Sequence, residues 1–334
     1  MTRGGLARRR RRLDRRWLVV AGLTAVSLVA HLWRLGERPL AHDEAIDAWF
    51  SWQARSFGVM RYDPVYHGPL RFYLEGPVLR LFGTGAFQAR LVAALAGAAT
   101  TALIAASTRT LGRIGAPAAA VMFLVSPTAL TVTRTGREDS LVALVSVALL
   151  LLVARLLAEP RPAHVVGAGV LLAVSFGLKE TTFLFGFAAL VFLAVAGIVA
   201  AARPGAARLA LGRFVALGRI PSMWAVIAFL ATFIVIFTAA FRYAEGFESG
   251  LLDGVRYWWS QHDVRRGGQP WFFYVLIYAA YEWLVLAFAV AGAVVTVRRR
   301  LLPGVWLATM FAVQLLVFTW AGEKFAWLAL HPLL

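Results

Sequence analysis

The chain has no cysteine among its 334 residues, and its 17 acidic residues are only half as numerous as its 34 basic ones. The absence of cysteine excludes disulfides, thiolate metal sites and a cysteine nucleophile. The sequence also lacks the motif GxxxxGK(S/T), a GxGxxG turn after a strand, and the metalloprotease motif HExxH. A nucleotide-driven pump and a soluble nucleotide-sugar enzyme are therefore excluded, and the chemistry depends on Asp, Glu, His, Lys and Arg.

Apolar residues make up 60% of the chain, against about 45–50% in an ordinary soluble domain. Apolar runs of about 20 residues recur, and each is long enough to cross a bilayer as a helix. The first run is too long for a signal-peptide core, so we expect it to remain as a span. The sequence predicts an all-α polytopic membrane protein with about nine transmembrane helices, at 17–36, 88–108, 116–134, 140–158, 164–179, 181–201, 222–241, 272–297 and 302–320.

Positive charge is concentrated in the tail and loops that lie on one side of the membrane. With the basic tail 1–16 in the cytoplasm, the inner segments hold 19 basic and two acidic residues, and this difference equals the whole net charge of +17. Cytoplasmic loops are enriched in Lys and Arg. The charge therefore reports topology and contact with membrane lipids, and it argues against nucleic acid as a partner.

Nearly all acidic residues fall in the outer segments, above all in the first outer loop, 37–87. This asymmetry predicts a multi-pass protein of the cell membrane with an extracytoplasmic active face. In that loop, apolar residues at helical spacing after His42 predict a short interfacial helix that begins with Asp43 and Glu44. Asp43 is either a helix cap or a general base at the membrane surface, and the sequence leaves both roles open.

Four further outer segments carry ionisable candidate residues. His67 stands in a Gly-Pro turn that would bring it back toward Asp43, as a substrate hydrogen-bond partner, a metal ligand or simply part of the turn. Arg137 and Asp139 lie at the hinge after the third span, where they either pair with each other or contact substrate.

Lys179 and Glu180 interrupt a long apolar stretch, and ionisable groups at membrane depth usually line a cavity or bind a substrate. Lys179 could otherwise be a lysine at a helix end whose ammonium reaches the interface. In the loop before the eighth span, His262, Arg265 and Arg266 lie among aromatic residues. Guanidinium groups on the outer side contradict the charge rule and are suited to phosphate.

The order of these segments resembles the membrane-embedded GT-C glycosyltransferases, in particular the dolichyl-phosphate-mannose–protein mannosyltransferases and the lipid A aminoarabinose transferases. Within that superfamily the chain is most similar to the flippase-activity-associated proteins of N-glycosylation. The resemblance implies one GT-C-like domain over 17–334, with Asp43 as the catalytic carboxylate and His67 in a His-Pro-Pro-Leu motif. Gly68 departs from that motif, because it replaces the first proline. The segments that carry the resemblance are Asp43-Glu44, Tyr66–Leu70, Arg137 with Asp139, Lys179, Trp258–Trp271 and Ala321–Leu328.

The resemblance implies transfer of a sugar from a polyprenyl- or dolichyl-phosphate carrier to a hydroxyl of a glycan, lipid or protein acceptor. Asp43 would be the general base, and Glu44 and His67 are the other candidate catalytic residues, although Glu44→Gln should be milder than Asp43→Asn. Lys179, Arg265 and Arg266 would contact the phosphate, His262 would contact the substrate, and a divalent metal ion is an open further partner. The alternative is a non-enzymatic protein that binds lipid-linked glycan or assists its translocation. The chain stops at Leu334 where these families usually continue, so we expect a C-terminal truncation.

Overall fold

The computed structural model describes residues 3–54, 61–202, 218–260, 267–299 and 301–334, and all regular structure in these ranges is helical. The elements are α1 (Arg3–Leu32), α2 (His42–Ala54), η1 (Pro64–Tyr66), α3 (Leu70–Phe82), α4 (Ala86–Ala106), α5 (Thr108–Val125), α6 (Pro127–Val132), α7 (Asp139–Ala158), α8 (Pro162–Phe176), α9 (Thr182–Ala202), α11 (Arg219–Phe237), α12 (Gly246–Ser260), α13 (Phe273–Tyr281), α14 (Trp283–Arg299), α15 (Leu302–Trp320), η3 (Ala326–Ala329) and α16 (Leu330–Leu333).

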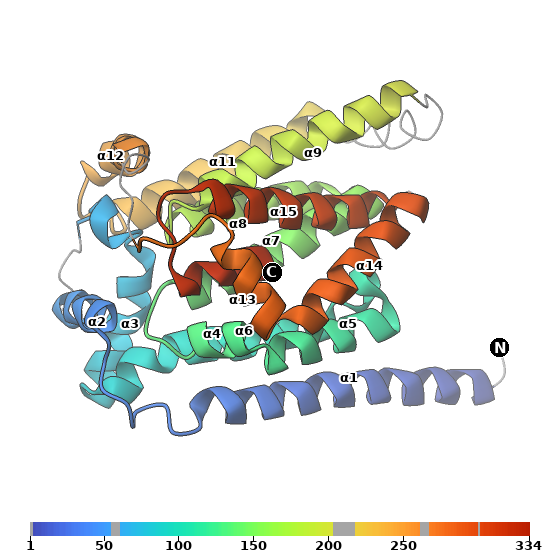
Figure 1. The fold of residues 1–334 in the computed structure, drawn as a ribbon, viewed down its shortest axis with the longest axis horizontal. Coiled ribbons are helices and arrows are strands. Elements are labelled where there is room, and N and C mark those ends of the chain that lie inside the picture. Colours follow the sequence, from blue (N-terminus) through green and yellow to red (C-terminus); the bar gives the residue numbers. More distant parts are fainter. Residues whose placement is uncertain (1–2, 55–60, 203–217, 261–266, 300) are drawn as a thin grey trace.

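The long helices lie side by side along one axis, as Figure 1 shows. Successive neighbours in the bundle are α1, α4, α7, α8 and α11, while α15 packs on both α7 and α9. The short helices α2, α3 and α12 gather at the end of the bundle away from the N-terminus. The predicted polytopic helical bundle is therefore confirmed, and the loop that follows the first span is helical as predicted.

Not every predicted span forms one long straight helix. Five helices are long and apolar enough to cross a membrane, and the bent pair α13–α14 makes a sixth, among the residues that the structure describes. The apolar helix α8 and the apolar part of α9 are shorter. The predicted span 116–134 is divided between α5 and α6, and the predicted span 272–297 bends by 102°.

These two breaks contact each other. Ser126 precedes Pro127, which disfavours helical geometry at Ser126, and the Ser126 hydroxyl caps the new helix by accepting the Ala129 N–H. At the other break, the buried Glu282 carboxylate accepts hydrogen bonds from the Ser126 hydroxyl at 2.7 Å and from the Thr128 N–H at 2.9 Å. Backbone groups freed at one break are thus satisfied by the side chain at the other.

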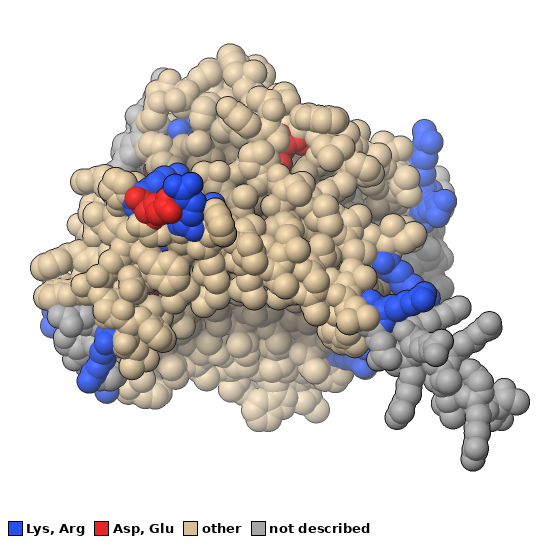
Figure 2. Space-filling model, turned by 90° about the horizontal axis from the view of Figure 1, so that it is seen from below, with Lys and Arg blue, Asp and Glu red and all other residues tan. Residues whose placement is uncertain are grey.

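The lateral surface is apolar, as expected for a protein surrounded by lipid. Figure 2 shows a face that is mostly uncharged between its two ends. On α1, large apolar side chains such as Leu18, Val26 and Val29 are more than half exposed. Such a surface would be a large exposed apolar patch in water, and it fits a membrane.

A buried polar contact connects α1 to the end of α6. His31 accepts or donates a hydrogen bond with Thr133 at 2.9 Å, and Gly97 of α4 lies against both side chains. A Cβ at residue 97 would lie within 2.5–2.7 Å of these two side chains, so only glycine allows α4 to approach this closely. The contact fixes the start of the turn between α6 and α7, which carries Arg137.

Candidate functional site

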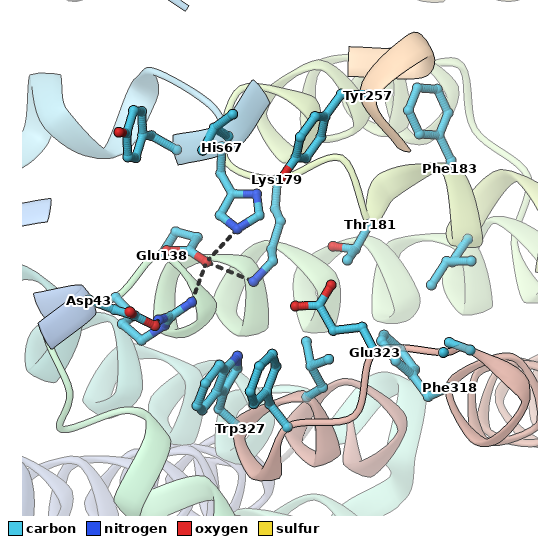
Figure 3. Close-up of a pocket in the computed structure, with 18 of the residues that line it drawn as sticks. Asp43, His67, Glu138, Lys179, Thr181, Phe183, Tyr257, Phe318, Glu323 and Trp327 are labelled. Atoms are coloured by element: carbon cyan, nitrogen blue, oxygen red, sulfur yellow. Dashed lines mark hydrogen bonds and ion pairs between the residues drawn. The ribbon is translucent and has the colours of Figure 1, made fainter. Parts of the chain in front are cut away.

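A cavity of about 1000 Å³ opens at the end of the bundle where α2 and α12 lie. Its polar wall comes from the first turns of α2, the turn after η1, and the turns before α7 and α9 (Figure 3). Its remaining wall is largely apolar and comes from α9, α12, α15 and the segment 321–328. A large apolar chamber with convergent ionisable groups at one end is suited to an amphipathic ligand.

Asp43 lines the polar wall from the first turn of α2. Its carboxylate pairs through Oδ2 with Arg137, and Oδ1 makes no further hydrogen bond within the described ranges. The Asp43 side chain is 47% exposed, so it is open to a ligand in the cavity. Of the two roles left open by the sequence, the placement fits a group that faces the cavity better than a helix cap.

Arg137 is enclosed more tightly than Asp43. Its guanidinium also lies 3.3 Å from the Asp139 carboxylate and 3.6 Å from Glu138, and it stacks over the Trp327 ring at 4.7 Å from the centroid. Burial lowers the pKa of Arg137, but the neighbouring carboxylates raise it by more, so the group stays charged.

Lys179 lies in the turn between α8 and α9, and its ammonium binds two carboxylates. Its Nζ lies 2.7 Å from both Glu138 and Asp139, and its side chain is only 4% exposed. Burial alone would raise the pKa of Glu138, but Lys179 and other nearby cations lower it well below its usual range. These charges form one compact ionised cluster, and Figure 3 shows Lys179 and Glu138 of this cluster in the wall of the cavity.

His67 is held between two carboxylates. Its Nδ1 lies 2.9 Å from Glu180, its Nε2 lies 3.6 Å from Glu138, and the other oxygen of Glu180 accepts a hydrogen bond from Tyr62 at 2.7 Å. The predicted turn therefore brings His67 into the cavity wall, beside Glu138 and Lys179.

Gly68 explains why this chain departs from the His-Pro-Pro-Leu motif. The Gly68 N–H donates a hydrogen bond to the Leu178 carbonyl at 3.1 Å, which proline could not do. A Cβ at residue 68 would lie 2.1 Å from the Gly177 carbonyl oxygen, so the two turns touch backbone to backbone. This close approach fixes His67 against Glu180.

Glu44 does not line the cavity, which argues against the predicted catalytic role. Its carboxylate is 3% exposed and accepts hydrogen bonds from Arg90 at 2.7 and 2.8 Å, and from the backbone N–H groups of Ala41 and Gly136 at 2.9 and 2.6 Å. Burial raises the pKa of Glu44, but the Arg90 and backbone contacts outweigh burial and lower it. Glu44 instead fixes the start of α2 to the turn that carries Arg137.

Several site residues were missed by the sequence analysis. Asp47 lines the cavity one helical turn after Asp43, and that i, i+4 spacing could have identified it. Its carboxylate lies 2.5 Å from the buried Arg71, and burial raises its pKa. His331 lies 3.1 Å from Asp139 because the last residues return into the bundle, and no local signal predicts that return.

Two further predictions concern the loop before α13 and a bound metal ion. His262, Arg265 and Arg266 lie outside the described residues, although the preceding Tyr257 and Ser260 line the cavity. Within the described ranges no cluster of three or more His, Asp or Glu side chains is arranged to hold a metal ion. Both ring nitrogens of His67 face carboxylates, so its placement fits a hydrogen-bond donor better than a metal ligand.

Residues 66–217 match the family model of dolichyl-phosphate-mannose-protein mannosyltransferase. No curated protein sequence matches the chain. The fold is similar to the crystal structure of ArnT from Cupriavidus metallidurans bound to undecaprenyl phosphate, with a TM-score of 0.73 and 20% identity, and to its apo state, with a TM-score of 0.67 and 18% identity. Each match covers 94% of this chain and 57% of ArnT, so the chain spans little more than half of that protein.

The fold and the matched residues define a polytopic membrane protein with the GT-C glycosyltransferase fold. The chain thus resembles the mannosyltransferases over residues 66–217 and ArnT in its fold, and both resemblances agree with the sequence motifs. The finer similarity to the flippase-activity-associated group stays a prediction.

Proposed function

We propose that this protein transfers a sugar from a polyprenyl- or dolichyl-phosphate carrier to an acceptor hydroxyl, on the extracytoplasmic face of the membrane. The observation that carries the proposal is the half-exposed Asp43 carboxylate, which faces a cavity of about 1000 Å³. One wall of this cavity is ionised, and the other is largely apolar apart from Glu323. The ionised wall suits the phosphate and sugar, and the apolar wall suits the prenyl chain. The similarity to ArnT, whose structure contains undecaprenyl phosphate, supports the choice of carrier.

Asp43 has the chemistry and the access that a general base needs. The acceptor oxygen attacks the anomeric carbon while Asp43 Oδ1 takes the hydroxyl proton. The bond between the anomeric carbon and the phosphate oxygen breaks, and its electron pair leaves with the lipid phosphate. A single displacement inverts the configuration, and Arg137 orients the base by holding the other carboxylate oxygen.

The leaving phosphate needs cations more than it needs a proton. Arg137 lines the cavity and can contact a phosphate oxygen. The sequence adds Arg265 and Arg266, which lie outside the described residues, as further candidates for this contact. Lys179 also lines the cavity, but its two carboxylate contacts give it a second role, which is to keep Glu138 and Asp139 ionised and in place. A divalent ion, if bound, would add positive charge at the phosphate.

The alternative function is non-enzymatic binding or translocation of lipid-linked glycan, which needs the same cavity but no base. Purified protein should release radiolabelled sugar from a polyprenyl-phosphate donor when a membrane extract supplies acceptors. A heat-inactivated sample is the control. Donor binding without any release of label would contradict the transferase proposal and support the alternative.

The proposed orientation can be tested cleanly because the chain has no cysteine. We expect Ser260→Cys, at the edge of the cavity, to react with a membrane-impermeant maleimide in intact cells. Arg299→Cys, at the last residue of α14, is expected on the cytoplasmic side and should react only after permeabilisation. The reverse labelling pattern would place the cavity in the cytoplasm and remove the basis for an extracytoplasmic transfer.

A further inference from the structure

Glu323 differs from the other acidic side chains of the cavity. Four carboxylates line the part of the cavity that the structure describes, and three of them pair with a cation. These pairs are Asp43 with Arg137, Asp47 with Arg71, and Glu138 with Lys179. The fourth, Glu323, makes no hydrogen bond or ion pair within the described ranges. Ionised carboxylates accept hydrogen bonds and donate none, so this side chain is available to a donor group of a ligand.

The Glu323 side chain enters the chamber from its apolar wall. It follows the end of α15, and Figure 3 shows its carboxylate extending toward Thr181, which belongs to the turn before α9. The Thr181 hydroxyl also lines the cavity and makes no hydrogen bond with any other described residue. A hydroxyl can both donate and accept. The two groups therefore leave a polar gap that a ligand with several hydroxyl groups would fill.

Aromatic rings surround this carboxylate. Phe325 and Trp327 of the same segment stack with their centroids 4.4 Å apart and their planes 7° apart, and both line the cavity together with Phe318. Ligand pockets commonly combine apolar and aromatic walls with a few polar groups that fix orientation and specificity. A sugar ring matches this combination, because its C–H groups pack on aromatic rings while its hydroxyls donate to a carboxylate.

The segment that carries Glu323 is irregular in backbone but held in place by α13 and the residues before it. The buried Tyr274 of α13 donates a hydrogen bond from its hydroxyl to the Phe325 carbonyl at 3.3 Å. A Cβ at Gly267 would lie 2.5 Å from the Lys324 carbonyl oxygen, so the two backbones approach closely. An acceptor that is fixed before the ligand arrives loses less conformational entropy on binding.

We propose that Glu323 is a specificity-determining residue that accepts hydrogen bonds from hydroxyl groups of the sugar on the lipid carrier, with Thr181 as a second polar contact to the same sugar. This inference rests on the proposed function and adds a sugar contact to the same cavity. The donor sugar is favoured over a sugar of the acceptor because Trp327, four residues after Glu323, stacks on Arg137, the cation assigned to the phosphate. The donor sugar is joined directly to that phosphate.

The test measures binding of undecaprenyl phosphate, bare or carrying mannose, glucose or galactose, to the purified full chain. The sugar preference is the Kd of the bare lipid divided by the Kd of the glycosylated lipid that the parent binds most tightly. Glu323→Ala should lower this preference by about 10- to 150-fold, the range expected of one hydrogen bond to a charged group. Glu323→Gln retains a neutral acceptor and should lower the preference less. Neither variant should weaken binding of the bare lipid.

Thr181→Val tests the second polar contact, because valine retains the branched shape and removes the hydroxyl. It should lower the sugar preference by about 2- to 12-fold, as expected of a hydrogen bond between neutral groups. Glu248→Ala is the matched control for Glu323→Ala. Glu248 is an exposed acidic residue of α12 that does not line the cavity, so its loss should leave the sugar preference unchanged. Thermal unfolding in detergent should be near parental for Glu323→Ala, since no described residue bonds to this carboxylate.

A parental sugar preference in Glu323→Ala would overturn the inference while leaving the proposed function in place. If that result came with a raised KM for the acceptor, the hydroxyls bound by Glu323 would be those of the acceptor. If it came with tighter binding of the bare lipid, Glu323 would instead pair with a cation of the protein. A parent that binds bare and glycosylated lipid equally would also overturn the inference, whereas a parent that binds none of these lipids would overturn the proposed function itself.

Discussion

Replacement of Asp43 by asparagine is expected to lower turnover by about 10²–10⁴-fold, the usual loss when general-base catalysis is removed. Asparagine has nearly the same shape and can still accept a hydrogen bond from Arg137, but it cannot take the acceptor proton. Arg137 also keeps its contacts with Glu138 and Asp139. Donor binding and thermal stability should therefore change little, and turnover with labelled donor should be measured together with both.

Asp253→Asn is the matched control for this experiment. The Asp253 side chain is 47% exposed, as is that of Asp43, and it too pairs with an arginine, Arg256, at 3.5 Å. It does not line the cavity, so turnover should stay near the parental value. Near-parental turnover in well-folded Asp43→Asn would refute the assignment of Asp43 as the base and would direct attention to Asp47 or Asp139.

Replacement of Glu44 by glutamine is expected to destabilise the protein by about 3–5 kcal/mol, because it leaves the buried Arg90 without its charge partner. Glu44 and Arg90 are each only 3% exposed, so water cannot take the place of the lost carboxylate. The sequence predicts a mild effect, and the structure reverses that expectation. Unfolding by heat or denaturant in detergent would measure the loss.

An exposed acidic residue of the same loop provides the control for Glu44. Glu37 pairs with Arg34 at 2.5 Å, but both side chains are more than half exposed, so Glu37→Gln should cost no more than about 1 kcal/mol. Glu44→Gln should also lower turnover, because the Gly136 N–H that binds Glu44 precedes Arg137 directly. Parental stability of Glu44→Gln would show that the Arg90 contact is not a buried ion pair in the protein.

The helices were predictable because hydropathy averaged over about 20 residues is a local property. Their breaks were not, because the bend between α13 and α14 depends on a contact between Glu282 and Ser126, which are far apart in sequence. At the site, the contacts of Lys179 were likewise beyond what the sequence could predict. Its position in an apolar stretch marked it as unusual, but its binding of Glu138 and Asp139 required the packing of α7 against α8.

The sequence alone determined the class of the protein, its helical character and the short list of ionisable residues from which a site could be built. Composition and motif order carry that information, since neither depends on how the helices pack. Only the tertiary structure separated Asp43, open to the cavity, from its neighbour Glu44, buried against Arg90. Adjacent residues on a helix point about 100° apart. The packing of α2 against α3 and the ion pair of Glu44 with Arg90 of α4, and not the sequence pattern, therefore decide which carboxylate meets a ligand and which one holds the fold.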